Sequence, residues 1–399
     1  RESADFVLFN TCCVRDNAER RALGNVTWLK EVRKKNPRLM IGVCGCMIQQ
    51  PGMAEKILKQ YRFVDLAFGT ANLYRLPELM LKALESDQAV VEVEEQNTIA
   101  EGLPVQRLRH DAAYITIMYG CDNYCTYCIV PYVRGRERSR EMSAIVAEAE
   151  ALRDSGVKEI MLLGQNVNSY GKGLQTPVTF AQLLKALDDV GIPRIRFMTS
   201  HPKDASHKLI DTIAAQPKLC KHLHLPVQCG SDELLKKMNR HYTVEQYLEL
   251  IEYARKTVPG ITFSSDIIVG FPGETEDDFE ASTAFVTGMR FLKVHVFPYS
   301  RRSGTPAYDF PQQVHEREKQ ERSRVMNAQA EEIRREVLAA YVGTEDDVLL
   351  ETPLSGTLFT GYTRLYIPVV VSAPGHKSGE IVHVRLGEYD GERVRAAIC

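Results

Sequence analysis

Three cysteines in the spacing Cys121-x-x-x-Cys125-x-x-Cys128 are the residues of this chain best suited to chemistry. A cubane iron–sulfur cluster contains four irons and is usually held by four thiolates. Three thiolates on one short loop hold three irons and leave the fourth open to a small ligand. Zinc is the alternative, but structural zinc sites usually pair two short Cys or His elements, and no second element lies nearby in the sequence. The spacing therefore favours a [4Fe–4S] cluster with one open iron.

Two further cysteine pairs follow apolar segments near the start of the chain. Cys12 and Cys13 come after an apolar run at residues 6–9, and Cys44 and Cys46 come after a second run at 39–43. A helical pattern over 17–35 and a third apolar run at 64–68 complete a strand–helix alternation, which predicts a parallel sheet. Ligands of such sheets bind beyond the carboxyl ends of the strands. Although a free cysteine is often a small buried hydrophobe, two pairs at one edge indicate metal or redox ligands.

Composition limits the class of protein. The 399 residues are 44% hydrophobic and 26% charged, which is typical of a soluble globular chain of two or three domains. No apolar run approaches membrane-spanning length. The net charge of −2 argues against a broadly basic nucleic-acid binder, so any RNA contact must use local basic patches. Ten unevenly clustered cysteines indicate ligands in a reducing compartment rather than disulfides.

The middle of the chain predicts an α/β fold with six strand–helix units. Such units suggest an incomplete βα barrel, whose chemistry lies at the carboxyl ends of its strands. Polar residues gather at those ends, for example Gln165 with Asn166 and the run Thr199-Ser-His201. The expected strands are 114–119, 159–163, 194–198, 222–227, 261–269 and 292–299.

The end of the chain has a different pattern. A highly charged helix over 315–340 reads as a solvated connection between domains. Short strands with glycine turns at 348–351, 366–372 and 380–386 predict a small β-barrel, a fold that often binds oligonucleotides. Residues 87–108 are charged and strand-poor, and read as a linker.

These motifs together resemble one family. The chain is similar to the methylthiotransferases among the radical S-adenosylmethionine (SAM) enzymes, in the branch that acts on isopentenylated adenosine of tRNA. The resemblance covers essentially the whole chain. It rests on Asn10-Thr-Cys12-x-Val-Arg15, Gly45-Cys46, Gly120-Cys-Asp-Asn-Tyr-Cys-Thr-Tyr-Cys-Ile-Val-Pro131, Arg134-Gly135, Ser139-Arg140, Leu163-Gly-Gln-Asn-Val-Asn168, Thr199-Ser-His-Pro202, His224-Leu-Pro-Val-Gln228 and Val269-Gly-Phe-Pro-Gly-Glu274.

The resemblance implies a domain order and a reaction. We expect a methylthiotransferase domain at 1–86, a linker at 87–106, a radical SAM core at 107–333 and an RNA-binding TRAM barrel at 334–399. The implied reaction is a transfer that inserts sulfur at C2 of N6-isopentenyladenosine 37 and methylates it. A C2–H bond in an aromatic ring is not acidic, so a carbon radical must remove the hydrogen and a second, pre-positioned source must supply the sulfur.

The same resemblance implies the cofactors and their ligands. Cys121, Cys125 and Cys128 match the ligands of the SAM-binding [4Fe–4S] cluster. Cys12 and Cys46 match two of the three ligands of an auxiliary [4Fe–4S] cluster. Cofactor-binding positions on the strand ends are Gln165, Asn166, Ser265, Asp266 and Gly270, for which turn and packing roles are an equal alternative. No residue is assigned as a catalytic acid or base.

Several residues depart from the family pattern or add to it. The third auxiliary cysteine of the family belongs to an element that precedes Arg1, so we expect this chain to retain only one stable cluster. Cys13 and Cys44 are not expected to replace it, because the side chain after a ligand at a strand end should point the other way. Cys229, Cys220 and Cys399 read as packing or incidental residues. Gly361-Tyr362-Thr363 lacks an arginine that often follows this glycine in the family, which predicts weaker or differently organised RNA binding.

The implied partners are the anticodon stem-loop of tRNA and an electron donor such as flavodoxin or ferredoxin. An anticodon-loop base can be splayed out without melting a duplex, and the arginines at 134, 136, 138 and 140 are candidates to bind its phosphates. We expect a monomeric, cytoplasmic protein without a membrane partner; a targeting segment stays open because Arg1 is not an initiator methionine. The alternatives are sister branches that act on threonylcarbamoyladenosine tRNA or on a ribosomal protein aspartate. A non-catalytic iron–sulfur electron carrier is a third reading, but it would not need six barrel units.

Overall fold

The fold is that of a computed structural model, which describes all residues except 1–3, 15, 87, 95–98 and 104. Arg15 of the first motif and parts of the expected linker therefore lie outside the described residues. The described chain forms two compact units. The first consists of Arg1–Val105, Gly120–Arg136 and Ser300–Asp309, and the second of Gln106–Tyr119, Glu137–Tyr299 and Phe310–Cys399. The predicted domain boundaries stay a prediction.

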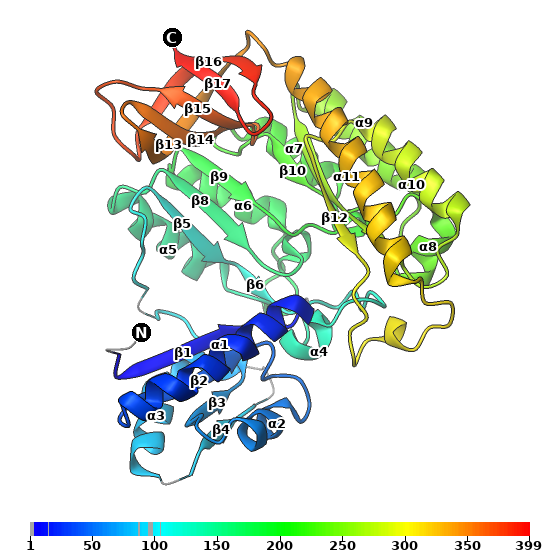
Figure 1. The fold of residues 1–399 in the computed structure, drawn as a ribbon. Helices are drawn as coiled ribbons and strands as arrows, with labels where there is room; N and C mark the ends of the chain where they lie inside the picture. Colours follow the sequence, from blue (N-terminus) through cyan, green and yellow to red (C-terminus); the bar gives the residue numbers. More distant parts are fainter. Residues whose placement is uncertain (1–3, 15, 87, 95–98, 104) are drawn as a thin grey trace. The chain divides into compact units, whose positions relative to one another are not determined.

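The first unit contains the predicted parallel sheet, with strand order β1-β2-β3-β4 (Figure 1). Its fourth strand lies in the segment that sequence analysis took as a strand-poor linker, where β4 pairs in parallel with β3. The elements are β1 (Phe6–Thr11), α1 (Asp16–Lys35), β2 (Met40–Gly45), α2 (Met53–Gln60), β3 (Leu66–Phe68), η1 (Thr70–Arg75), α3 (Leu76–Glu85), β4 (Val90–Glu92), α4 (Val130–Arg134) and η4 (Pro306–Tyr308).

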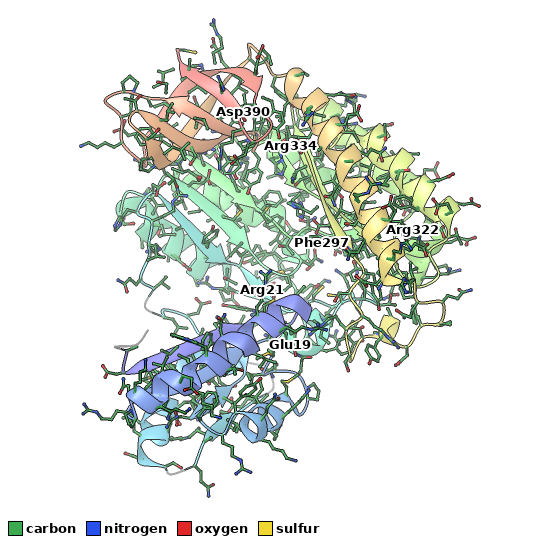
Figure 2. The ribbon with its side chains drawn as sticks, in the orientation of Figure 1. Glu19, Arg21, Phe297, Arg322, Arg334 and Asp390 are labelled. Carbon is green, nitrogen blue, oxygen red and sulfur yellow. The ribbon has the colours of Figure 1, made fainter. Side chains whose placement is uncertain are left out.

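One apolar core packs part of the segment 120–136 against the sheet of this unit. Ile129 and Val133, on either side of the start of α4, belong to the same buried cluster as Leu29 of α1 and Ile41 of β2. The loop at 300–309 is fixed by an ion pair, 2.7 Å long, between Arg302 and Glu19 of α1, both of which are largely buried. Figure 2 labels Glu19. The two segments therefore belong structurally with the amino-terminal sheet.

The six predicted strand–helix units form the larger part of the second unit, as two three-stranded parallel sheets, β5-β8-β9 and β10-β11-β12. A parallel bridge between Ile195 and Leu219 connects the two sheets. The elements are β5 (Ala112–Thr116), β6 (Met118–Tyr119), β7 (Arg138–Ser139), α5 (Met142–Asp154), β8 (Glu159–Leu163), η2 (Val167–Ser169), α6 (Phe180–Val190), β9 (Arg194–Phe197), η3 (Pro202–Asp204), α7 (His207–Ala215), β10 (His222–His224), α8 (Asp232–Lys237), α9 (Val244–Thr257), β11 (Thr262–Val269), α10 (Glu276–Met289) and β12 (Lys293–Pro298).

Local sequence explains where these helices begin. Thr243 accepts a hydrogen bond from the backbone of Gln246, whose side chain accepts one from the backbone of Thr243 in return, and this capping box begins α9. The same reciprocal pair starts α6 at Thr179. Each box satisfies amide groups that have no partner within the helix.

The helix α11 (Glu316–Ala339) is not the solvated connection expected from its charge. It buries Lys319, Arg322, Met326 and Ile333 against the core. The guanidinium of Arg322, which Figure 2 labels, lies 2.7 Å from the carboxylate of Glu274, and both side chains are almost fully buried. Because α11 has few apolar residues, its charge pattern did not indicate that one face of the helix is buried.

The carboxyl-terminal segment forms the predicted small barrel, which is closed in the order β13-β14-β15-β17-β16 (Figure 1). Its strands are β13 (Glu345–Ser355), β14 (Leu358–Thr363), β15 (Pro368–Ser372), β16 (Ile381–Tyr389) and β17 (Val394–Ile398). The sequence did not predict β14, which mixes polar and apolar residues, or β17, which holds two alanines and an arginine. Among the described residues, no helix is both long enough and apolar enough to cross a membrane.

Candidate functional site

The loop that carries Cys121, Cys125 and Cys128 is held at its two ends by backbone contacts within the first unit. The amide of Cys121 donates to the carbonyl of Gly135 at 3.2 Å, and the amide of Cys128 donates to the carbonyl of Cys125 at 2.9 Å. Gly120 adopts φ +79° where a Cβ would collide with the carbonyl of Arg136, so this turn requires glycine. Cys125 is buried and the other two thiols are partly exposed.

The helix α4 fixes this loop to the amino-terminal sheet. It begins two residues after Cys128, and its apolar side packs into the core through Val133. The loop also contacts the segment 300–309, because the amide of Ala307 donates a hydrogen bond to the carbonyl of Thr126 at 2.9 Å. The three thiols are therefore carried on a braced loop rather than on a free one.

Cys12 and Cys46 come together at the edge of the sheet, as predicted. Thr11 and Gly45 are parallel partners at the ends of β1 and β2, and each thiol-bearing residue comes next in its chain. The amide of Cys46 donates to the carbonyl of Thr11 at 3.0 Å, so the two backbones are one strand spacing apart, about 4.8 Å. Gly45, at φ +99°, leaves no room for a Cβ between these strands. This juxtaposition fits a shared metal centre.

The side chains of Cys12 and Cys13 point in different directions at this edge, as predicted. Cys12 is exposed, whereas Cys13 is fully buried. Cys13 is also close enough to Cys46 for the two thiols to share a hydrogen bond. The expectation that Cys13 is not a cluster ligand stays a prediction.

A positive charge faces the buried pair. The Nε of Arg134 lies 3.1 Å from the Sγ of Cys46. The hydrogen bond from Cys13 and the charge of Arg134 lower the pKa of Cys46 to about 6, while the pKa of Cys13 is raised by the same bond and by burial. Cys46 is therefore the thiol of this edge that ionises first, and a thiolate is the form that binds metal.

The remaining cysteines are packing residues or lie on the surface. Cys44 belongs to a separate apolar cluster with Phe68, and burial raises its pKa to about 12. Cys229 is fully buried against Ser282. Cys220 is buried as well. Cys399 is exposed on the small barrel, within 4.8 Å of ligand atoms of Glu345 and His383.

The five strand-end residues predicted to bind the cofactor have different surroundings in the second unit. The hydroxyl of Ser265 is fully buried and bonded to the backbone of Leu225 and Val227, which is a packing role. Gly270 makes room for the side chain of Lys319. The assignment of these two residues stays a prediction, but their local contacts favour the structural alternative.

Asn166 and Asp266 have polar atoms suited to a ligand. Gln165, which directly precedes Asn166, is partly buried. The amide nitrogen of Asn166 donates to Asp204 at 2.6 Å, and its oxygen is buried without a partner in the described structure. A carboxylate oxygen of Asp266 lies 3.6 Å from the imidazole of His224. The amino-acid and ribose parts of SAM carry the hydrogen-bonding groups that such atoms require, so these residues fit the cofactor.

Further unpartnered polar atoms surround Asn166. They belong to Asn168, Ser200 and His201, and they are buried within loops that meet through a 3.0 Å bond from the amide of Val167 to the carbonyl of Thr199. Buried polar groups are normally satisfied, so this cluster indicates a binding region. Sequence analysis noted the polar run at 199–201 but did not select these side chains, because nothing in the sequence separates an unsatisfied serine from a turn serine.

Comparison with known proteins agrees with this site. The radical SAM superfamily model matches residues 115–286, and the family described as uncharacterised protein family UPF0004 matches residues 1–69. The tRNA-2-methylthio-N(6)-dimethylallyladenosine synthase of Alkaliphilus oremlandii is 49% identical over 97% of this chain and 83% of its own length. The enzyme of the same name from Clostridium tetani is 53% identical over 81% of this chain and 72% of its own length. The chain belongs to the tRNA-2-methylthio-N(6)-dimethylallyladenosine synthase family.

A solved structure agrees at the level of the fold. The radical SAM methyltransferase TsrM from Kitasatospora setae aligns with a TM-score of 0.56, at 17% identity, over 89% of this chain and 69% of its own. As a member of the synthase family, the chain is a transferase of the radical SAM class. A [4Fe–4S] cluster and SAM are the cofactors of that class.

Three of the four arginines expected to bind phosphates have partners within the protein. Besides the contact of Arg134 with Cys46, Arg136 pairs with Asp122 at 2.8 Å. Arg140 is buried and pairs with Glu148 at 2.8 Å. In this synthase, the short arginine run therefore braces the cluster loop and the neighbouring strand, which the sequence pattern alone could not distinguish from an RNA-binding turn.

Proposed function

We propose that this chain converts N6-isopentenyladenosine at position 37 of tRNA to its 2-methylthio derivative. Its relatives at about half identity carry that activity in their names. We further propose that it uses two [4Fe–4S] clusters, one on Cys121, Cys125 and Cys128 and an auxiliary one whose ligands include Cys12 and Cys46.

The observation that carries this proposal is the bridge between the two cysteine sites inside the first unit. The loop with the three cysteines continues directly into α4, and Arg134 at the end of α4 contacts Cys46 at the sheet edge. Sulfur insertion needs a radical source and a sulfur source at one place. An electron carrier of the iron–sulfur class would need no such arrangement.

The protein residues have distinct tasks in this reaction. When bound, the clusters and SAM supply a 5′-deoxyadenosyl radical, which removes the C2 hydrogen, and the sulfur and methyl group that replace it. Cys121, Cys125 and Cys128 hold the first cluster on a loop braced by Gly120 and α4. The polar atoms of Asn166 and Asp266 orient SAM by hydrogen bonds. The partners are the anticodon stem-loop and a one-electron donor such as flavodoxin or ferredoxin.

Mass spectrometry of tRNA nucleosides tests the proposal. A deletion strain complemented with the full-length gene should regain 2-methylthio-N6-isopentenyladenosine, and a Cys125→Ala gene should not. Cys220→Ala, a buried cysteine outside both sites, is the matched control and should restore the nucleoside. Recovery of a 2-methylthio group on threonylcarbamoyladenosine instead would move the chain to the sister branch.

A further inference from the structure

A cavity of about 470 Å³ lies in the second unit, between the start of α7 and the start of α9. Its wall begins at Pro202 and Lys203, directly beyond the carboxyl end of β9, where βα barrels bind their ligands. The side chains that define its chemistry are Lys203, His207, His241, Tyr242, Gln246 and Glu249. None of the functional assignments above uses this cavity.

The cavity wall offers hydrogen-bond donors to an anion. Among the lining residues, Lys203 is the cation, Glu249 is the carboxylate, and His207 and His241 are exposed imidazoles that can donate hydrogen bonds. The amino ends of two helices, capped by Ser206 and Thr243, also border it. A helix amino end carries a partial positive charge, which attracts anions.

Neighbouring buried groups strengthen this preference. The guanidinium of Arg240 is buried beside Tyr242 and donates to the carbonyl of Pro226 at 2.8 Å. The ring of His201 meets the ring of Tyr242 edge to face at 5.7 Å. Burial, together with the positive charges of Arg240, Lys203 and His241, lowers the pKa of His201, so its ring is neutral.

The tautomer of His201 follows from its hydrogen bond. Its Nδ1 accepts from the amide of Lys203 at 3.3 Å. In a neutral ring the proton then resides on Nε2, which is buried and has no partner in the described structure. The hydroxyl of Ser200 is in the same situation. Both donors belong to the binding region around Asn166, and in the chain they directly precede Pro202 and Lys203 of the cavity wall.

We propose that this cavity binds a phosphodiester group of the RNA substrate, with Lys203 as the charged contact and His241 as a hydrogen-bonding contact. The inference rests on the proposed function and names a part of its substrate-binding surface. SAM is a poor occupant, because its sulfonium and ammonium groups outweigh its single carboxylate. RNA supplies anionic oxygens in series, and cations at a protein surface are the main source of affinity for them.

Charge reversal with a matched control tests the inference. Lys203→Glu alters the cavity wall, and Lys185→Glu makes the same charge change on an exposed position of α6. The affinity for a fluorescent anticodon stem-loop should be measured by anisotropy at several salt concentrations. We expect Lys203→Glu to raise the Kd roughly ten-fold and to reduce the salt slope by about one. Lys185→Glu should change the Kd less than two-fold, as roughly expected for a distant, screened charge.

The variant His241→Ala and a measurement of SAM affinity distinguish an RNA site from a cofactor site. His241→Ala should raise the Kd for RNA a few-fold without reversing charge, and circular dichroism should show that both variants fold. Equal RNA affinities for Lys203→Glu and Lys185→Glu would overturn the inference. A loss of SAM affinity as large as the loss of RNA affinity would also overturn it, by assigning the cavity to the cofactor. Failure of the wild-type chain to bind the stem-loop would instead reject the proposed function, and the phosphodiester site with it.

Discussion

The guanidinium of Arg134 donates a hydrogen bond from Nε to the Sγ of Cys46 over 3.1 Å, and so connects the helix after the three-cysteine loop to the edge of the amino-terminal sheet. Both residues belong to the first unit. A charged donor stabilises a thiolate, and partners outside the ligand shell orient ligands and tune the metal they hold. Arg134 lies on the helix that follows the three-cysteine loop, and it therefore positions Cys46, a ligand of the proposed auxiliary cluster.

Replacement of Arg134 should weaken the auxiliary site selectively. In a chain with Cys121, Cys125 and Cys128 all changed to Ala, only the auxiliary cluster can form, so its iron can be counted alone. Arg134→Gln should then lower cluster retention roughly 10- to 100-fold, the usual cost of losing an outer partner. Iron and sulfide content and the electron paramagnetic resonance signal after anaerobic reconstitution give the measurement.

Arg136→Gln is the matched control, because Arg136 lies two residues away and pairs with Asp122 rather than with a thiol. It should leave the auxiliary signal unchanged. Equal retention in the Arg134 and Arg136 variants would refute the role of Arg134. Absence of any cluster in the parent triple variant would instead agree with the expectation that this chain retains only one stable cluster.

Each thiol of the three-cysteine loop should be essential for radical formation. Cys121→Ala, Cys125→Ala or Cys128→Ala leaves only two thiolates, and ligand number decides whether such a cluster is retained. Reductive cleavage of SAM to 5′-deoxyadenosine, followed by chromatography, should fall to background. Cys229→Ala, which removes a fully buried thiol far along the chain, should retain cleavage. Production of 5′-deoxyadenosine by a triple Ala variant would contradict the assignment.

The sequence predicted the elements of this fold better than its contacts. Strand periodicity and cysteine spacing located the sheet edge that unites Cys12 and Cys46, because parallel strands always end at a common edge. Strand alternation also predicted that Cys13 points the other way from Cys12, but not that its buried thiol lies beside Cys46. The partner of Arg134 lies 88 residues away in the sequence, and no local pattern encodes such a contact.

The small barrel shows the same limit. Its strand pattern was recognisable, but the role of Gly361-Tyr362-Thr363 was not. The carbonyls of Tyr362 and Thr363 accept hydrogen bonds from Arg194, at 2.8 and 3.1 Å, inside the second unit. This stretch therefore docks the barrel on the amino ends of the core strands through its backbone carbonyls.

A buried charge network should make this docking surface important for stability. Glu159 lies 2.8 Å from Arg194 and 2.9 Å from Arg196, both nearly inaccessible, and Tyr366 of the barrel covers Arg196. Removal of one partner from such a network leaves an uncompensated buried charge, which typically costs about 3–5 kcal/mol. Glu159→Ala should lower the free energy of unfolding by about that amount in urea titrations.

The control for this variant is Asp154→Ala, which breaks the exposed pair with Arg153 and should cost less than about 1 kcal/mol. A stability loss in Glu159→Ala no greater than in the control would show that solvent enters the interface. Deletion of the barrel should destabilise the core for the same reason, because Arg194 loses the carbonyls of Asp347 and Tyr362.

The same network should make the second unit sensitive to acid. Burial alone would raise the pKa of Glu159, but Arg196 and Arg194 outweigh it and hold the pKa below its ordinary value of 4.5. A carboxyl whose pKa is lowered by folding stabilises the folded state fully above its ordinary pKa, and this contribution is lost as the pH falls through the lowered value. Unfolding in urea between pH 6 and pH 3 should therefore show stability that declines below about pH 4.5. Glu159→Gln cannot ionise, so its stability should start lower and decline less over the same interval. Parallel pH profiles for the two proteins would show that other carboxylates, and not Glu159, govern the acid response.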